Sequence, residues 1–166
     1  AGCAGRAVLR RHAGFTIHHL HTGLREDSMQ PATPAKPRPR IDTVSRGFWD
    51  NAREGHLSVQ RCDDCSDIHF PGSPVCPKCL SEKQSWVPVS GRGTVLSWVR
   101  FHRAYWDGFR ADLPYLVALV GLEEGPMLMT SIVDAPADGP EIGASVTAVF
   151  EQVDDQLTLP KFRIGA

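Results

Sequence analysis

The spacing of hydrophobic and polar positions changes along this chain, and each change predicts a different kind of element. A short helix is predicted where apolar residues recur at helical spacing, after the capping residues Asp42 or Ser45 and before Gly55. Its apolar face consists of Val44, Phe48, Trp49 and Ala52. Because Phe48 and Trp49 are large for so short an element, we expect them to pack on the rest of the chain or on a partner.

Beyond this helix the apolar residues alternate or cluster in short β-branched runs, which is typical of strands. Residues 57–61 and 68–70 predict a small hairpin, and residues 86–89 predict a further strand. Five more strands are predicted at 94–101, 115–122, 127–133, 145–150 and 157–162. Turn-forming Gly, Pro and Asp separate them, with no long helix between. Five such strands predict a small OB-fold barrel, whereas an immunoglobulin-like sandwich needs about seven.

The first forty residues follow neither pattern. Residues 30–40 contain four prolines, which favour an extended backbone, so we interpret residues 1–40 as a disordered or extended, proline-rich arm. This arm holds seven Lys or Arg and two acids, a charge of +5, whereas residues 41–166 hold 11 and 17, a charge of −6. The acidic body disfavours nonspecific binding to nucleic acid.

Four of the five cysteines form two pairs of equal spacing, Cys62 with Cys65 and Cys76 with Cys79. One tight turn can point both sulfurs of such a pair inward, so two pairs can surround a single ion. Four thiolates favour zinc in a structural role, because no position remains for a water, and iron of the rubredoxin type fits nearly as well. Two disulfides are less favoured, since the sequence shows no secretory signal. His69 is given no ligand role because the cysteines already fill the site.

The predicted organisation is therefore an arm at residues 1–40, a helix plus zinc ribbon at 41–90 and an OB-fold barrel at 91–166, all in a mainly β chain. The fifth cysteine, Cys3, lies in the arm and is given no role. No run of about eighteen apolar residues occurs, so no membrane helix is predicted. We expect a cytoplasmic location with reduced thiols.

A long stretch inside the predicted barrel, residues 102–113, combines cations with aromatic rings. Long loops in compact domains often carry function, and arginine with aromatic residues can hold a phosphate or form a protein interface. The alternative is a loop that folds back over the end of the barrel. The candidate contacts with substrate or partner are Phe48 and Trp49 in the helix, and Arg100, His102, Arg103, Tyr105, Trp106, Phe109 and Arg110 in or beside this loop.

No grouping of acid, base and nucleophile stands out, so we predict no catalytic residue. A dyad of His102 with Asp107 or Asp112 lacks a nucleophile. A phosphate-binding loop at residues 91–93 lacks the third glycine and the following helix that such a site requires.

From about Ser45 to Arg163 the chain carries, in order, the short helix, the two cysteine pairs and the motifs GRGTV, PY, EGP and LTLP. In this order they resemble the thiolase-associated OB-fold proteins with an N-terminal rubredoxin-like zinc ribbon, the family catalogued as domain of unknown function thirty-five. The resemblance implies that Cys62, Cys65, Cys76 and Cys79 are the metal ligands. Residues 1–40 fall outside it.

The resemblance also implies a function. Members of this family are accessory subunits or domains that accompany thiolase-fold enzymes acting on acyl-coenzyme A thioesters, including thiolases, acyltransferases and aldolases that cleave steroid side chains. In the steroid case the domain can follow a hydratase domain, which is consistent with a start in mid-chain. A non-catalytic subunit of a hetero-oligomer in lipid or steroid degradation is therefore expected, with acyl-CoA as the substrate of its partner.

We hypothesise that the ribbon and helix dock on the enzyme, while the loop at 103–109 closes over the coenzyme A or acyl portion. A nucleic-acid-binding protein with a zinc ribbon and OB-fold is the alternative, and a rubredoxin-like electron carrier comes third.

Overall fold

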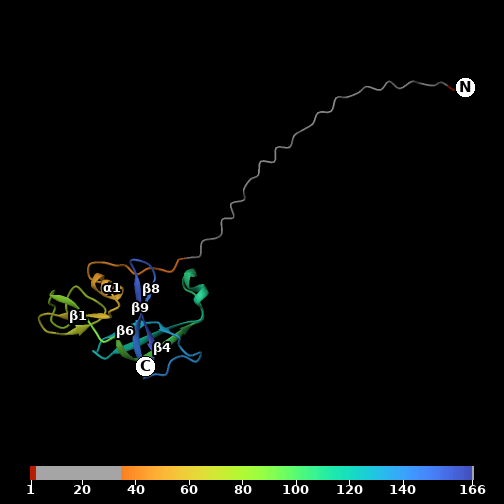
Figure 1. The fold of residues 1–166 in the computed structure, drawn as a ribbon. Helices are drawn as coiled ribbons and strands as arrows, with labels where there is room; N and C mark the ends of the chain where they lie inside the picture. The colour runs from red at the N-terminus through yellow and green to blue at the C-terminus, as the bar shows by residue number, and fades with distance from the viewer. Residues whose placement is uncertain (3–34, 166) are drawn as a thin grey trace. The chain divides into compact units, whose positions relative to one another are not determined.

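The computed structural model describes residues 1–2 and 35–165, and Figure 1 shows its ribbon. Cys3 and most of the predicted arm lie outside the described residues. The described residues 35–165 lie in one compact unit. The elements described in it are α1 (Arg46–Arg53), β1 (Ser58–Cys62), β2 (Ile68–His69), β3 (Gln84–Pro88), β4 (Arg92–Phe101), the 3-10 helix η1 (Asp107–Asp112), β5 (Tyr115–Leu122), β6 (Met127–Thr130), β7 (Ile132–Val133), β8 (Ser145–Gln152) and β9 (Thr158–Ile164).

Helix α1 confirms the predicted helix, and both candidate capping residues contribute to its start. The carboxylate of Asp42 accepts the backbone N–H of Ser45 at 2.9 Å, and the Ser45 hydroxyl oxygen accepts the backbone N–H of Asp42 at 3.1 Å. The Ser45 N–H, followed by the Ser45 hydroxyl, lowers the pKa of Asp42, because these donors stabilise the ionised carboxylate. After the helix, Gly55 takes a left-handed φ of 79°, which suits a glycine C-cap.

The ribbon contains a three-stranded antiparallel sheet in the order β2-β1-β3. Strand β3 follows the second cysteine pair and aligns Val87 with Val59 of β1. The indole of Trp86 in β3 donates a hydrogen bond to the carbonyl of Val44 at 3.1 Å and lies 5.8 Å from the ring of Phe48. These contacts join the ribbon to the segment that starts α1 and to the helix itself.

The second sheet has six strands in the order β6-β5-β4-β8-β9-β7. All neighbours are antiparallel except β7 and β9. The run predicted as one strand at residues 127–133 is interrupted at Ser131, so that β6 and β7 form the two edges of the sheet. The topology is OB-fold-like. The hydrogen-bonded order of the strands is open, so closure of the OB-fold-like sheet into a barrel is not shown.

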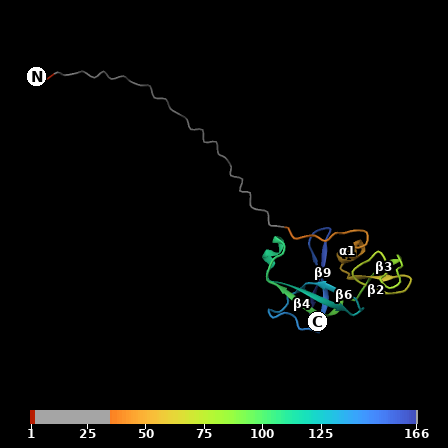
Figure 2. The ribbon, with the colours of Figure 1, turned by 180° about the vertical axis from the view of Figure 1, so that it is seen from behind.

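The ribbon and the second sheet share a hydrophobic core. Residues alternate between buried and half-buried along β5, as a strand with one face on the core requires. Phe48 and Val59 belong to the same buried cluster as Val95 and Phe162 of the second sheet. Helix α1 contacts β1, β3, β8 and β9, and Figures 1 and 2 show it between the ribbon and the sheet. No helix among the described residues is long and apolar enough to cross a bilayer.

Candidate functional site

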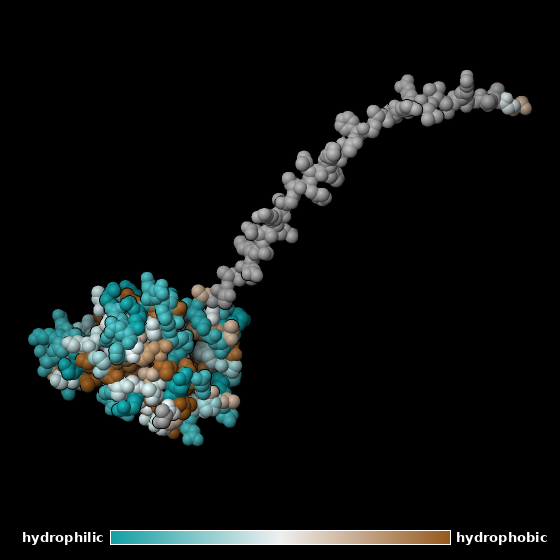
Figure 3. Space-filling view, in the orientation of Figure 1, coloured by the Kyte–Doolittle hydropathy of each residue, from teal (hydrophilic) through white to brown (hydrophobic). Residues whose placement is uncertain are grey.

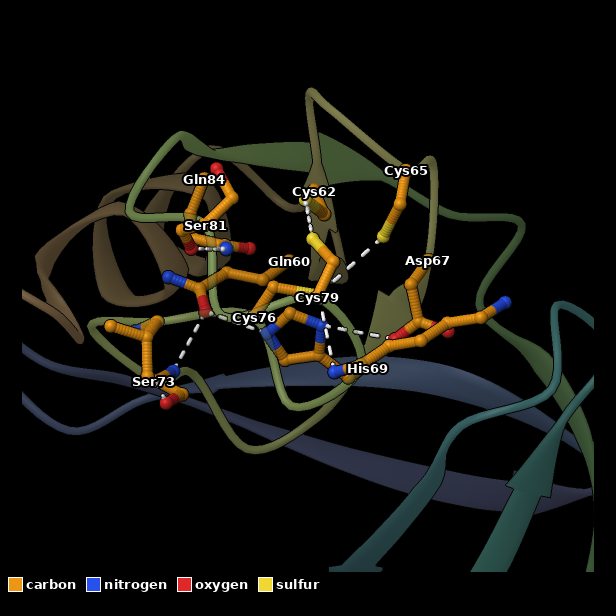
Figure 4. A network of polar contacts seen from close by, with 12 residues as sticks. Gln60, Cys62, Cys65, Asp67, His69, Ser73, Cys76, Cys79, Ser81 and Gln84 are labelled. Atoms are coloured by element: carbon orange, nitrogen blue, oxygen red, sulfur yellow. Dashed lines mark hydrogen bonds and ion pairs between the residues drawn. The ribbon is translucent and has the colours of Figure 1, made fainter.

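The four paired cysteines converge on one point, as their spacing predicts. Their sulfur atoms all lie within 4.8 Å of one another. The Sγ atoms of Cys62 and Cys79 are 3.5 Å apart, and those of Cys65 and Cys76 are 3.6 Å apart. A tetrahedral ion with bonds of about 2.3 Å to sulfur requires separations of roughly 3.8 Å, whereas a disulfide requires about 2.05 Å. The described thiols are free, and their geometry fits a metal ion (Figure 4).

Both cysteine pairs sit on turns with the same backbone pattern. The carbonyl of Cys62 accepts the N–H of Ser66 at 2.9 Å, and the carbonyl of Cys76 accepts the N–H of Leu80 at 2.9 Å. Ser66 and Leu80 each have a left-handed φ of 62°. The N–H of Lys78 points at the Cys76 sulfur at 3.4 Å. At the second pair, a backbone N–H of the turn therefore faces a sulfur of the cluster.

The thiols influence each other because they are so close. The backbone N–H of Cys65 is the main cause that lowers the pKa of Cys62 to about 7. The N–H of Asp67 lowers the pKa of Cys65, but the neighbouring thiols and burial outweigh it and raise this pKa to about 12. The pKa of Cys79 is also raised, although the N–H of Ser81 lowers it. Cys65 and Cys79 therefore resist ionisation by themselves, so the cluster fits a cation that binds these thiols as thiolates.

The two aspartates between the first cysteines hold the first turn to the segment that follows the second cysteine pair. Asp64 accepts hydrogen bonds from the hydroxyl of Ser81 at 2.7 Å and from the Lys83 ammonium at 3.2 Å. The Ser81 hydroxyl and then Lys83 lower the pKa of Asp64. Asp63 accepts the hydroxyl of Ser85 at 2.9 Å. These contacts brace the turns from outside the sulfur cluster.

His69 lies beside the cluster and takes no part in it. Its Nε2 lies 3.1 Å from the Oε1 atom of Gln60, which also accepts the backbone N–H of Ser73 at 2.7 Å. Its Nδ1 is 3.7 Å from Asp67 (Figure 4). The described group of candidate metal ligands contains the cysteines alone. The histidine and Gln60 instead fix the loop that follows β2.

The aromatic loop at residues 102–113 contains η1 and lies at the opposite end of the compact unit from the ribbon in both views (Figures 1 and 2). Phe109 packs on Tyr115 with ring centroids 5.3 Å apart, and Arg110 pairs with Asp107 at 2.6 Å. Arg100 is half-buried, with its guanidinium 5.5 Å from the Trp98 ring. The exposed candidates are His102, Arg103, Tyr105, Trp106 and Arg110.

One contact of this loop has no local sequence signal. The ammonium of Lys36, in the described end of the arm, pairs with Asp112 at 2.5 Å and lies 5.5 Å from the Phe109 ring. Arg38 pairs with Asp154 in the β8–β9 turn. The described end of the arm is thus held to the body by two ion pairs.

The two helix candidates differ in their access to a partner. Phe48 is 7% exposed and packs on Trp49, Phe70 and Trp86, so most of its side chain belongs to the core. It also lines the groove beside Trp49. Trp49 is half-buried and lines a groove of about 380 Å³ between the helix, the ribbon and the second sheet. Sequence reasoning did not identify this groove, because its residues come from segments far apart in the chain.

Known proteins share this combination of ribbon and sheet. Residues 49–83 match the family described as the ChsH2 rubredoxin-like zinc ribbon domain, and residues 86–151 match the ChsH2 C-terminal OB-fold domain. A DUF35 domain-containing scaffold protein of Methanocaldococcus jannaschii is 32% identical over 109 residues, which cover 64% of this chain and 77% of that protein. The chain belongs to the DUF35 family. This confirms the resemblance found in the sequence.

Two further similar proteins are a chain of a solved aldolase structure and a longer protein. A chain in the solved structure described as Ltp2-ChsH2(DUF35) aldolase is 36% identical, with a TM-score of 0.71, over 78% of this chain and 100% of that one. A probable enoyl-CoA hydratase alpha subunit of Thermomonospora curvata is 36% identical over 138 residues, 83% of this chain and 43% of that protein. The DUF35 chain therefore spans less than half the length of this relative.

Proposed function

We propose that this DUF35 chain is a non-catalytic accessory subunit or domain that binds a thiolase-fold enzyme acting on acyl-CoA thioesters. The observation that carries the proposal is its 36% identity to the whole DUF35 chain of a solved aldolase structure. The names of a scaffold protein and of an enoyl-CoA hydratase alpha subunit among its relatives support it further. In this proposal the partner contributes the nucleophile or base, and this chain contributes binding surfaces.

The metal is proposed to be zinc in a structural role. Cys62, Cys65, Cys76 and Cys79 would hold it, and four thiolates leave no position for a reacting water. When bound, zinc supplies a positive charge that keeps the sulfurs ionised and the two turns together. Metal analysis of the purified chain distinguishes zinc from iron, because an iron site of this type is red and redox-active.

The exposed part of the aromatic loop is the proposed contact for the coenzyme A portion of the substrate. Tyr105 and Trp106 are 66% and 58% exposed, and Arg103 lies beside them in the chain. Exposed aromatic rings can stack on a base, and a guanidinium can bind a phosphate. Lys36, in the described end of the arm, places its ammonium beside this loop, where it pairs with Asp112 and lies near the ring of Phe109. A localised contact of this kind suits a body whose remaining charge is acidic.

The finer proposal concerns the reaction of the partner. The solved relative belongs to an aldolase, a class of enzyme that makes or breaks carbon–carbon bonds, and the enoyl-CoA in the name of another relative points to acyl-CoA thioesters. We infer a partner that makes or breaks carbon–carbon bonds in acyl-CoA thioesters, in lipid or steroid degradation.

Affinity capture of the full chain from a lysate of its own host tests this function. We expect a thiolase-fold enzyme in near-stoichiometric amount, identified by mass spectrometry, and its retention on the chain in buffers of moderate salt. Recovery of nucleic acid alone, released by salt, would favour the nucleic-acid-binding alternative. Recovery of no acyl-CoA enzyme would overturn the proposal.

A further inference from the structure

The groove beside Trp49 is built from segments of the chain that meet only in the folded protein. Helix α1, the loop after β2, and strands β3, β6 and β9 all contribute to its lining. Its apolar side chains include Trp49, Phe70, Trp86, Met129 and Leu159. Among the described residues that line it, Arg40 alone carries a charge. The groove is therefore an aromatic and aliphatic surface with a cation and no acid.

Apolar surface continues from the groove along strand β6. Leu128 points into the core and is 7% exposed, whereas its neighbours Met127 and Met129 are 54% and 76% exposed. Figure 3 shows hydrophobic surface where the ribbon meets the sheet, among largely hydrophilic surroundings. Methionine side chains adapt to the shape of a partner, and exposed apolar patches with polar surroundings mark interaction sites.

One wall of the groove depends on the ribbon. The side-chain carbonyl of Gln60 is 3.1 Å from His69 and accepts the N–H of Ser73, so it fixes the loop between them, which contains Phe70. Gln60 is 4% exposed and lies in β1, the strand that ends at the first metal ligand. The loop backbone at Gly72 lies so close to the ring of Trp86 that a Cβ atom would overlap it. The metal centre and this wall are therefore parts of one rigid arrangement.

We propose that this groove receives an apolar side chain of the partner enzyme and that an acidic residue beside that side chain pairs with Arg40. The inference rests on the proposed function, because it takes the thiolase-fold enzyme as the occupant. A pocket of Trp, Phe and Met side chains is the kind of site in which a few residues supply most of the binding energy. The guanidinium of Arg40 favours a carboxylate at the rim of the groove; Asp42 lies near Arg40 but does not line the groove.

Site-specific photo-cross-linking locates the occupant directly. Benzoylphenylalanine replaces Met129 in the full chain, and a matched chain carries it at Ile142, which is 64% exposed and does not line the groove. Each chain is irradiated in complex with the thiolase-fold enzyme that the wild-type chain captures. We expect the Met129 position to cross-link a segment of the enzyme that contains an apolar residue next to Asp or Glu. A complex that forms without a cross-link at position 129, or that cross-links only at position 142, overturns the proposal.

Binding measurements test the same groove through its energetics. We expect Trp49→Ala and Arg40→Glu to weaken binding of the captured enzyme by about tenfold or more. Arg53→Glu, a matched charge reversal at an exposed helix position outside the groove, should change the Kd much less. If the wild-type chain binds the enzyme and both groove variants bind equally well, the groove proposal fails and the proposed function stands. If the wild-type chain binds no thiolase-fold enzyme, both fail.

Discussion

Leu80 shows how a single residue in the metal-binding turns carries backbone strain. It has a left-handed φ of 62° although it has a side chain, and it is 73% exposed, so its side chain gains little from burial. A residue other than glycine costs roughly 1–2 kcal/mol in this conformation. We expect Leu80→Gly to raise the free energy of unfolding by about 1 kcal/mol, after the greater entropy of glycine in the unfolded chain is subtracted. Urea unfolding at fixed zinc concentration measures this. Leu80→Ala keeps the backbone strain, and a glycine variant no more stable than the alanine variant would contradict the argument.

Gly47 lies in α1, where glycine is usually unfavourable. Replacement by alanine in an exposed helix would gain about 1 kcal/mol. Here a Cβ atom would overlap the ring of Trp86, the side chain that joins the ribbon to the segment before the helix. We therefore expect Gly47→Ala to lower the free energy of unfolding by about 1–3 kcal/mol, measured by thermal or urea unfolding. Asp50→Ala, on the exposed side of the same helix, should be close to neutral. A gain in stability for Gly47→Ala would show that Trp86 can move away at little cost.

At the scale of elements, those with a local signal were predictable. Helix α1 follows from its apolar spacing, although Ser45 makes no side-chain cap hydrogen bond, and the cysteine turns follow from their spacing. The split of residues 127–133 at Ser131 was not predictable, because the run reads as one strand, and only its pairing with β5 on one side and β9 on the other divides it. The contact of Lys36 with Asp112 likewise joins segments far apart in the chain. Long-range pairing decides such features, and the sequence pattern records only local preference.

The ribbon should release protons when it binds zinc. The pKa of Cys65 is raised to about 12 and that of Cys79 is also raised, so both thiols are protonated slightly above neutral pH in the metal-free ribbon. Zinc binds thiolates, so we expect about two or more protons to be released per zinc. Protons compete with the metal, so its affinity falls as the pH falls. Below the pKa of Cys62, about 7, this thiol is protonated as well, so one more proton must leave when zinc binds. The affinity for zinc then falls more steeply with falling pH.

Calorimetry in buffers of different ionisation enthalpy measures the number of protons released by the ribbon. Cys79→Ser serves as the comparison, because it removes one of the protonated thiols, and it should release about one proton fewer. A release of less than one proton per zinc by the wild-type chain would mean that the thiols are already ionised without the metal.

At the scale of the whole molecule, the ribbon and the second sheet should unfold together. The core is continuous from Phe48 and Val59 to Val95 and Phe162, and α1 contacts both parts. The apparent binding free energy of a structural zinc, about 10–16 kcal/mol in small fingers, is as large as the whole stability of a typical domain. Removal of zinc should therefore unfold the ribbon. The sheet then loses the side chains of the helix and ribbon that pack against its own core residues.

We expect calorimetry of the zinc-bound chain to show one cooperative unfolding transition. A chelator should lower the temperature at which the sheet unfolds as well as that at which the ribbon unfolds. Leu157, a buried residue in the β8–β9 turn outside the ribbon, supplies a comparison. Leu157→Ala should lower the midpoint temperature of the same single transition when zinc is bound. Two transitions, with the upper one unchanged by the chelator, would show that the sheet folds without the ribbon. The ribbon and the sheet would then fold independently. In that case, loss of zinc would not disturb the wall of the groove that the sheet contributes.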